Sequence, residues 1–334
     1  MVQRISLAHG EGGELTHQLI QEVFMSAFSS KKEIQHDSAV FPIEGKRIAV
    51  TTDSYVVQPI FFPGGNIGKL AITGTVNDLA VCCAVPKMIT AGFILEEGFA
   101  LSDLNKIVHS MAEEAKAANV KIVAGDTKVV EKGSADGIFI NTTGIGAISE
   151  QVCSPAIKKG DCVVVSGTIG DHGIAILSAR NQLGLLTDVQ SDCASLHSLI
   201  QSLLEQVDGI RLMRDPTRGG LATSLVELCE DFQFSVELEE DLIPIRREVT
   251  GACNILGFDP LYLANEGKVV IVCDSSNKDK VIEIMQNHKY GEEAKVIGKV
   301  ISVNDSNGKL YSRTQIGTTR RIHRLNGMIL PRIC

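Results

Sequence analysis

The chain alternates between short apolar runs and segments in which apolar residues recur with helical spacing. The apolar runs predict buried strands at 47–52, 88–95, 121–124, 138–148, 162–165, 269–273 and 294–303. Helical spacing predicts helices at about 66–83, 103–115, 174–183, 222–231 and 277–288, and a further helix after Glu14 with apolar positions from Leu15 to Ala27. Because strands and helices alternate throughout, we expect an α/β (α+β) protein.

A chain of 334 residues is longer than one ordinary hydrophobic core needs, which predicts two domains. The polar break Lys158–Asp161 divides two runs of predicted elements, and we place the boundary near Pro155. The expected parts are an N-terminal domain (1–155), a C-terminal α/β domain (156–313) and a basic, irregular, flexible tail (314–334).

Charge and cysteine usage restrict the class of protein. The net charge of −8 argues against a nucleic-acid or anionic-membrane partner, and the longest apolar run, Leu79–Leu95, is interrupted by Pro86 and Lys87. The N-terminus has no signal-peptide pattern, and the nine cysteines form no CxxC motif. We therefore expect a cytoplasmic protein in a reducing compartment, in which the neighbouring Cys82 and Cys83 are small core residues.

The last residue, Cys334, is a candidate reactive group. Pro331 stiffens the approach to it, and a chain end is usually mobile, so the thiol would sit on a tether. A prenylation signal is excluded, because it needs a cysteine four places from the end. Two interpretations stay open: an incidental residue of a frayed end, or a swinging nucleophile that enters a site elsewhere in the chain.

Four acidic residues follow predicted strands or lie on predicted helices: Asp37, Asp53, Asp78 and Asp126. The segment Gly125–Lys128 places a carboxylate, a hydroxyl and an amine where the strand 121–124 is expected to end, and α/β proteins commonly carry chemistry at such ends. Clustered carboxylates suit Mg²⁺ that bridges to ATP phosphates. Taken singly, each residue fits a helix cap or a solvated turn equally well.

Four other segments have candidate functions. The Gly12–Gly13 turn before the first helix, and the Arg214, Arg218 and Gly219–Gly220 group before a later helix, both suit an anion, or an ordinary helix start. His172 fits a base or, more simply, a residue that caps its own helix. Glu266 lies in a tight turn before a strand.

Seven motifs together resemble the HypE family of hydrogenase maturation factors over essentially the whole chain. They are His9–Gly13, Phe61–Gly68, Gly74–Ala80, Gly125–Val130, Arg214–Gly220, Ala264–Lys268 and the terminal Pro331–Cys334. The resemblance implies the two-domain fold of the aminoimidazole ribonucleotide synthetase superfamily, with paired N-terminal domains in a homodimer. It also implies ATP-dependent dehydration of a carbamoyl group on the terminal cysteine to S-cyanide, destined for the iron of [NiFe] hydrogenase. The implied partners are the carbamoyltransferase HypF and the HypC–HypD complex.

The resemblance and the chemistry together suggest a role for each candidate. Dehydration of an amide needs neutralised phosphates, a fixed substrate and a base. Cys334 would carry the substrate, Glu266 would be the base because a carboxylate is ordinarily ionised at neutral pH, and Lys128 would stabilise the phosphoryl group or replace Glu266 as base. The expected Mg²⁺ ligands are Asp37, Asp53, Asp78 and Asp126. The expected nucleotide contacts are Gly12, Gly13, Asp53, Asn77, Asp78, Gly125, Asp126, Thr127 and Arg218.

Two alternatives remain at this stage. Another enzyme of the superfamily, such as a thiamine-phosphate kinase or a selenophosphate synthetase, would turn over ATP without needing Cys334. A non-catalytic dimeric carrier would ferry a thiol-bound group and would not turn over ATP.

Overall fold

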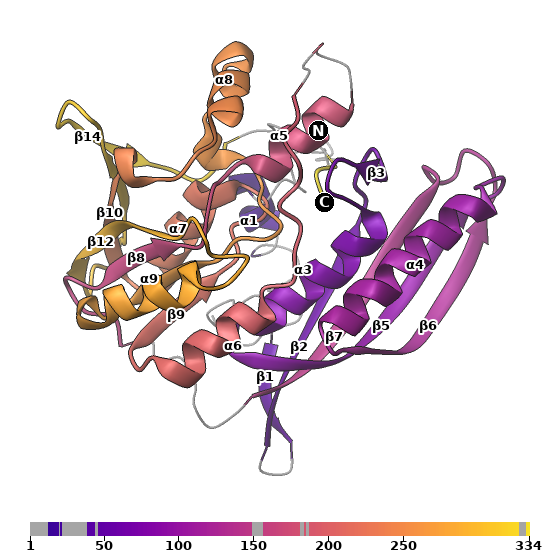
Figure 1. Cartoon of the computed structure of the whole chain (residues 1–334), viewed down its shortest axis with the longest axis horizontal. Coiled ribbons are helices and arrows are strands. Elements are labelled where there is room, and N and C mark those ends of the chain that lie inside the picture. Colours follow the sequence, from indigo (N-terminus) through magenta and orange to yellow (C-terminus); the bar gives the residue numbers. More distant parts are fainter. Residues whose placement is uncertain are drawn as a thin grey trace.

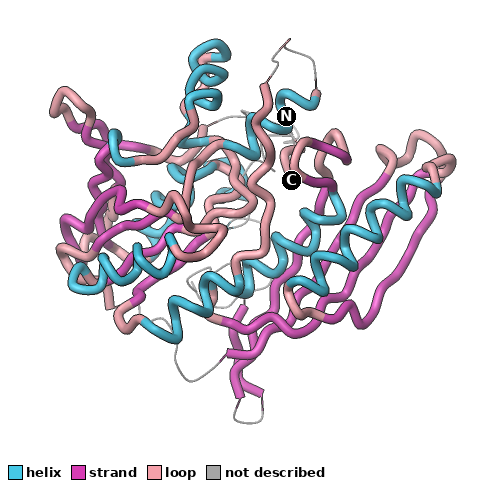
Figure 2. The backbone as a smooth tube through the Cα atoms, viewed as in Figure 1, coloured by secondary structure: helices cyan, strands magenta, loops and turns pink. Residues whose placement is uncertain are grey.

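The computed structural model describes residues 13–19, 21, 39–43, 46–148, 156–180, 184, 187–326 and 332–334. These residues form two sheets with helices packed between and around them (Figures 1 and 2). The predicted strands and most of the predicted helices are confirmed within a few residues. The expected helix at Glu14 is described as α1 (Glu14–Leu19), and its continuation lies outside the described residues.

The first sheet has five strands, and only its last pair is parallel. Its order is β1 (Ala39–Ile43), β2 (Lys46–Tyr55), β7 (Ile138–Ile148), β5 (Ala84–Glu96) and β6 (Lys121–Val130). Helices α3 (Ile67–Val81) and α4 (Leu101–Ala117) lie on one face of this sheet (Figure 1). On the other face, polar side chains of neighbouring strands bond to each other, for example Thr143 to Thr52 (3.1 Å) and Asn141 to Ser54 (3.0 Å). We call this second side the open face.

The second sheet has seven strands, and β10/β13 is its one parallel pair. Its order is β14 (Thr319–Ile322), β13 (Leu310–Arg313), β10 (Phe234–Glu239), β12 (Lys295–Val303), β8 (Cys162–Val165), β11 (Val270–Cys273) and β9 (Ile210–Arg214). Helix α7 (Gly220–Asp231) packs on one face, and α6 (His197–Gln206) and α9 (Lys278–Gln286) pack on the other. Since both sheets are mainly antiparallel, α+β describes the fold better than α/β.

Helix α3 joins the two halves of the molecule. Its Leu70 and Ile72 share one hydrophobic cluster with Ile174 of α5 (Asp171–Ala179) and Val249 of α8 (Arg247–Leu256). The helix is therefore enclosed by the first sheet on one side and by the second half on the other. Asn77 of this helix is buried and Asp78 is half-buried, so the two residues do not lie on a solvent-exposed polar side.

Two further expectations are wrong for a common reason, which is pairing between strands. Strand β6 does not end before Gly125, because its pairing with β5 continues to Val130. The stretch after Thr314 is not wholly irregular, because β14 pairs antiparallel with β13 and completes the edge of the second sheet. Residues 149–155 lie outside the description, so the domain boundary near 155 stays a prediction.

Cys82 and Cys83 also differ from expectation. Helix α3 ends at Val81, and Cys83 has a positive φ of 62°. Cys83 is buried and disulfide-bonded, so the interpretation of this residue as a plain core thiol is wrong.

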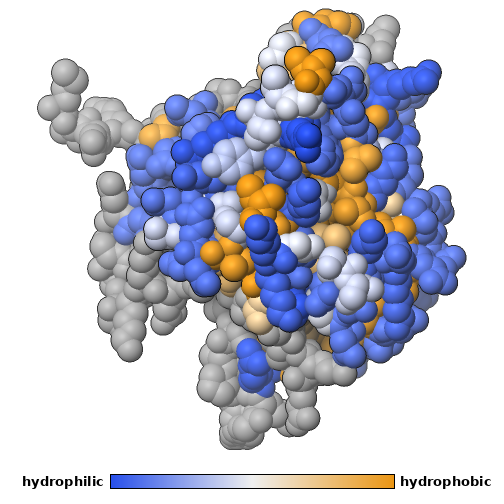
Figure 3. Space-filling model, turned by 90° about the vertical axis from the view of Figure 1, so that its left-hand side faces the viewer, coloured by the Kyte–Doolittle hydropathy of each residue, from blue (hydrophilic) through white to orange (hydrophobic). Residues whose placement is uncertain are grey.

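The surface seen from the side of β13 and β14 is mainly hydrophilic, with hydrophobic patches between the charged side chains (Figure 3). Within the described ranges, no helix is both long and apolar enough to cross a membrane.

Candidate active site

The C-terminus is docked against the body of the protein, beside β3 (Phe61–Phe62) and α5 (Figure 1). The main-chain oxygens of Arg332 and Cys334 accept hydrogen bonds from the N–H groups of Gln58 and Val56, each at 3.1 Å. The Ile333 side chain is 5% exposed and belongs to the main hydrophobic cluster. In this structure the terminal residues are therefore packed and hydrogen-bonded against the body of the protein and do not extend freely into solvent.

Strand β2 and helix α3 contribute a group of acidic and hydroxyl side chains on the face of the first sheet that α3 and α4 cover, here called the covered face. Thr51 donates to Asp78 (2.7 Å), and the buried Tyr55 hydroxyl lies 3.4 Å from Asp53 and 3.3 Å from Thr75. Burial, with the nearby charges of Asp53 and Asp78, raises the pKa of Tyr55 well above its usual value. The structure thus brings two of the predicted Mg²⁺ ligands into one neighbourhood.

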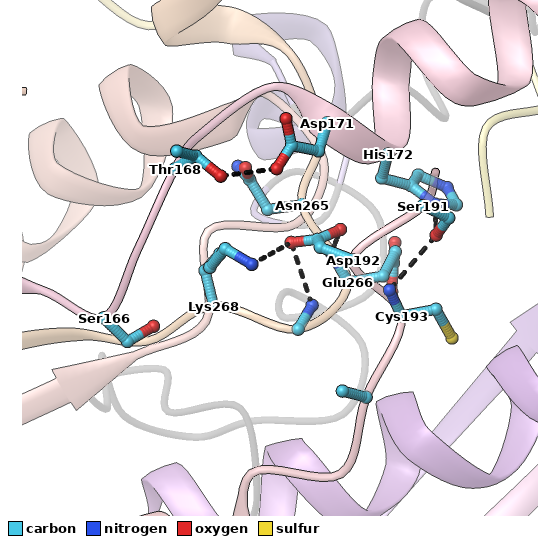
Figure 4. Close-up of polar contacts among 12 residues, drawn as sticks. Ser166, Thr168, Asp171, His172, Ser191, Asp192, Cys193, Asn265, Glu266 and Lys268 are labelled. Atoms are coloured by element: carbon cyan, nitrogen blue, oxygen red, sulfur yellow. Dashed lines mark hydrogen bonds and ion pairs between the residues drawn. The ribbon is translucent and has the colours of Figure 1, made fainter. Parts of the chain in front are cut away.

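The Ala264–Lys268 turn is held from both sides (Figure 4). Asp192 accepts hydrogen bonds from the N–H groups of Glu266 (3.0 Å) and Gly267 (3.3 Å), and its carboxylate lies 3.5 Å from Lys268 Nζ. Asn265 accepts from Gly170 N–H (2.8 Å) and donates to the Pro216 carbonyl (2.8 Å). The turn is therefore locked to two other loops, and the Glu266 side chain projects from a fixed backbone.

Glu266 has the properties of a functional carboxyl group. It is 3% exposed, and its Oε1 atom has no hydrogen-bond partner among the described residues. Desolvation, with the charges of Asp192 and Asp215, raises the pKa of Glu266 well above its usual value, and Arg218 opposes the shift. Burial therefore favours the protonated form of Glu266 and opposes the ionisation expected of a carboxylate from the sequence.

Arg218 connects the terminal cysteine to this group. The charge of Cys334 is the main cause of the raised pKa of Arg218, and Asp53 and Glu266 add to it. Arg214 instead lies 3.5 Å from Glu227 of α7, in the salt-bridged helix start that was the alternative interpretation. The charge of one arginine of the motif therefore interacts with the terminal residue, and the other arginine pairs with the helix.

The polar residues of β6 lie apart from this group. Asp53 is in register with Thr142, Ala91 and Gly125, so three strand spacings, about 14 Å, separate β2 from β6. Asp126 follows Gly125 and points to the open face, whereas Asp53 points to the helical face. A single chain therefore does not form the predicted cluster of carboxylates.

Lys128 and its neighbours have other contacts in this structure. Lys128 and Asp126 form a surface ion pair at 2.9 Å, each 70% exposed, and this pair with the Thr127 N–H lowers the pKa of Asp126. A Cβ on Gly125 would meet the Ala91 carbonyl at 2.6 Å, so glycine permits close pairing with β5. Nucleotide contacts by Gly125, Asp126 and Thr127 stay predictions.

The remaining candidates contribute to packing or lie outside the description. Gly13 is buried against the Leu325 carbonyl, and Gly12 and Asp37 lie outside the described residues. The Asn77 side chain bonds to Ala194 O (2.9 Å) and Leu196 N (2.8 Å), so it ties α3 to the loop before α6. A nucleotide contact by Asn77 stays a prediction.

His172 neither caps its helix nor faces solvent. The N-cap of α5 is Gly170, and the fully buried imidazole bonds to Ser191 (2.8 Å) and to the Ile333 carbonyl (2.8 Å). Ser191 and Asp192 come from a stretch that the sequence predicts only as a loop. No local pattern there indicates that both residues support the site.

Two of the predicted carboxylates, Asp53 and Asp78, suit the coordination that Mg²⁺ requires. The described part of the chain contains no group of three His, Cys, Asp or Glu side chains placed to hold a metal ion. Mg²⁺ usually takes one or two carboxylates and completes its shell with water and phosphate oxygens, so Asp53 and Asp78 fit such a role beside a nucleotide.

Comparison with known proteins agrees with this geometry. Residues 35–148 match the N-terminal domain of AIR synthase related proteins, and residues 158–310 match the C-terminal domain. Carbamoyl dehydratase HypE of Cupriavidus necator is 47% identical over 99% of this chain and 95% of its own length. The chain belongs to the HypE family of carbamoyl dehydratases.

Two solved structures of the HypE family have the same fold. A HypE–HypF complex gives a TM-score of 0.86 at 49% identity, over 92% of this chain and 99% of that one. A HypE structure in complex with ATP gives a TM-score of 0.82 at 41% identity, over 99% of this chain and 100% of the other.

Proposed function

We propose that this protein dehydrates a carbamoyl group on its own Cys334 to S-cyanide at the expense of ATP, and so supplies the cyanide ligand for the iron of [NiFe] hydrogenase. The docking of the terminal residues against residues 56–58, where the charge of Cys334 acts on Arg218 and Arg218 also interacts with Glu266, is the observation that carries this proposal. It explains why the chain ends in a cysteine, which a kinase of a small molecule has no need for. It also distinguishes the protein from a passive carrier, which needs no base beside its thiol.

The reaction breaks the C–O bond and both N–H bonds of the carbamoyl group. ATP supplies the phosphoryl group that turns the amide oxygen into a leaving group. Glu266 accepts one N–H proton, and the second leaves with the departing phosphate, so that S–C(=O)–NH₂ becomes S–C≡N. Arg218 stabilises negative charge near the reacting carbon, because a guanidinium donates to oxyanions with fixed geometry.

Asp53 and Asp78 would hold Mg²⁺ in this scheme, with the ion neutralising the phosphate charge. Support comes from their shared position on the covered face of the first sheet, where Thr51 and Tyr55 orient them. Asp126 and Asp37 would be further ligands of the ion. The chain would divide into an N-terminal domain at 1–155, a C-terminal domain at 156–313 and a tail at 314–334.

A homodimer is supported by the first sheet. The edge strand β6 exposes Ile122, Val123 and Val129, and the open face beside it exposes Met88 and Ile94. A long apolar edge strand without a partner promotes association, and a second copy would cover it. In such a dimer, Asp126 and Lys128 would lie at the junction of two chains, where Lys128 could serve a phosphoryl group that it does not reach within one chain.

HypF would load the carbamoyl group, and the HypC–HypD complex would accept the cyanide. The similarity to a HypE found in complex with HypF supports the first of these partners. The net charge of −8 and the motif set support a cytoplasmic protein without nucleic-acid or membrane partners.

The deciding experiment follows the mass of the C-terminal peptide. The purified protein is incubated with HypF and its carbamoyl donor, then with Mg²⁺ and ATP. We expect a carbamoyl adduct on Cys334 that becomes a cyano adduct only with ATP, and no adduct in Cys334→Ala, which should still bind ATP. An adduct on another cysteine, or undiminished ATP turnover in Cys334→Ala, would contradict the proposal in favour of a carrier at another site or a small-molecule kinase.

A further inference from the structure

The docked terminus is held on two sides. The oxygens of Arg332 and Cys334 accept from the N–H groups of Gln58 and Val56, and Arg332 has a positive φ of 54°. The oxygen of Ile333 is taken by His172 Nε2 at 2.8 Å. Because Ile333 directly precedes the cysteine, this hydrogen bond fixes the main chain next to Cys334 and so affects the position of the thiol.

The tautomer of His172 follows from its two partners. A carbonyl oxygen only accepts, so Nε2 must carry the proton that bonds to Ile333. The neutral ring then has an acceptor at Nδ1, which takes the hydroxyl proton of Ser191 at 2.8 Å. Burial lowers the pKa of His172, which favours this neutral form.

Ser191 is in turn fixed by the backbone. Its hydroxyl accepts from Cys193 N–H (3.1 Å), and its own N–H donates to the Pro63 carbonyl (2.8 Å). The edge of the Phe62 ring and the imidazole meet at 90°, with ring centroids 5.6 Å apart. The imidazole is therefore held in one orientation by Ser191, which lies beside it (Figure 4), and its Nε2–H donates to the Ile333 carbonyl.

We propose that His172 is a positioning residue: its Nε2–H, oriented by Ser191, grips the Ile333 carbonyl and stops Cys334 at the site formed with Glu266 and Arg218. This inference rests on the proposed function for its catalytic consequence, but not for the docking itself. His172 touches neither the thiol nor the proton that Glu266 removes. It acts by setting the fraction of molecules in which the terminus is docked.

The test compares variants that keep or move the donor. His172→Gln retains an N–H near the ε position, His172→Asn places it near the δ position, and His172→Leu removes it. The first readout is the rate at which iodoacetamide alkylates Cys334, followed by the mass of the terminal peptide in the protein without nucleotide. Loss of one buried hydrogen bond should raise the undocked fraction, and with it the rate, by about 3- to 10-fold in His172→Asn and His172→Leu. His172→Gln should stay close to wild type.

The second readout is single-turnover dehydration of carbamoylated protein at saturating ATP. We expect a slowing of about 3- to 10-fold in the Asn and Leu variants, with unchanged KM for ATP and an unchanged rate of carbamoylation by HypF. His288→Leu is the matched control, because that histidine follows α9 and bonds to Ser198 of α6. This control should match wild type in both readouts.

Each outcome decides the question. Alkylation of Asn and Leu variants at the wild-type rate overturns the proposal, as does a Gln variant that fails equally, since the histidine would then be needed only for packing. If His172→Leu does not fold, the Gln and Asn pair still separates the two cases. If no variant and no wild-type protein forms S-cyanide, the proposed function fails, and the alkylation rates still report on docking.

Discussion

Replacing Glu266 by glutamine tests the assignment of the base. Glutamine keeps the shape of the side chain and the fixed turn around it, but cannot accept a proton. Loss of a general base costs about 10²–10⁴-fold in rate, so single-turnover formation of S-cyanide should fall by that factor. ATP binding should survive, because the expected metal contacts come from Asp53 and Asp78 of the first half.

The raised pKa of Glu266 gives this prediction a pH signature. A buried carboxyl in its protonated form cannot act as a base, so the wild-type rate should fall as the pH drops through a value well above the usual pKa of about 4.3. Glu266→Gln should lack that acidic limb. The assay is quenched-flow mass analysis of the terminal peptide from pH 5 to 9, a range of roughly four units around neutrality.

Stability should change in the opposite direction. A carboxyl with a raised pKa in the folded state stabilises the fold while it is protonated, and that contribution is lost as the pH rises through the folded pKa. Glutamine does not titrate, so the variant should gain in unfolding free energy relative to wild type with increasing pH. A variant with the wild-type rate and the wild-type acidic limb would show that Glu266 is only a turn residue, and the role of base would pass to Lys128.

Three further predictions follow from charge and burial. Asp78→Asn should lower Mg²⁺-dependent ATP hydrolysis by about 10²-fold, measured by phosphate release, whereas Asp305→Asn, in the loop between β12 and β13, should not; equal rates would remove Asp78 from the metal site. Val129→Lys, at a position 68% exposed on β6, should convert dimer to monomer in light scattering, whereas Ile255→Lys, 79% exposed on α8, should not; a dimeric Val129 variant would exclude this edge. Arg211→Leu removes the ion-pair partner of Asp161, which is 4% exposed and 3.3 Å from the guanidinium. The substitution should lower the unfolding free energy by roughly 3–5 kcal/mol in urea titration. A loss below about 1 kcal/mol would refute the pairing.

The first half shows where sequence patterns succeed and where they fail. The strand at 138–148 and the helix at 66–83 are recognisable because apolar residues recur at the spacing of each structure. The prediction that the strand ends just before Asp126 is wrong. The residues of a strand do not mark its end when the neighbouring strand continues to pair with it. Continuation of the strand by six residues, to Val130, moved Asp126 from an expected strand end to the middle of an exposed edge.

The second half shows the same limit for contacts between distant segments. Glu266 and Cys334 could be singled out from their motifs, and both lie near Arg218 in the fold. The raised pKa of Glu266 could not be predicted, since desolvation depends on which segments cover a side chain. Ser191 and Asp192 belong to an irregular stretch, and their support of His172 and of the turn at Glu266 arises only from folding.

The sequence by itself determined the family, the two successive sheets and the residue types available for chemistry, because periodicity and motif spacing are local properties of the chain. Only the tertiary structure decided which of these residues meet. It put Asp53 and Asp126 on opposite faces of one sheet, since side chains alternate along a strand and register sets the face. It also drew the terminal cysteine into the body of the protein, because a buried imidazole and two backbone amides offer its last carbonyls partners that no neighbour along the chain provides.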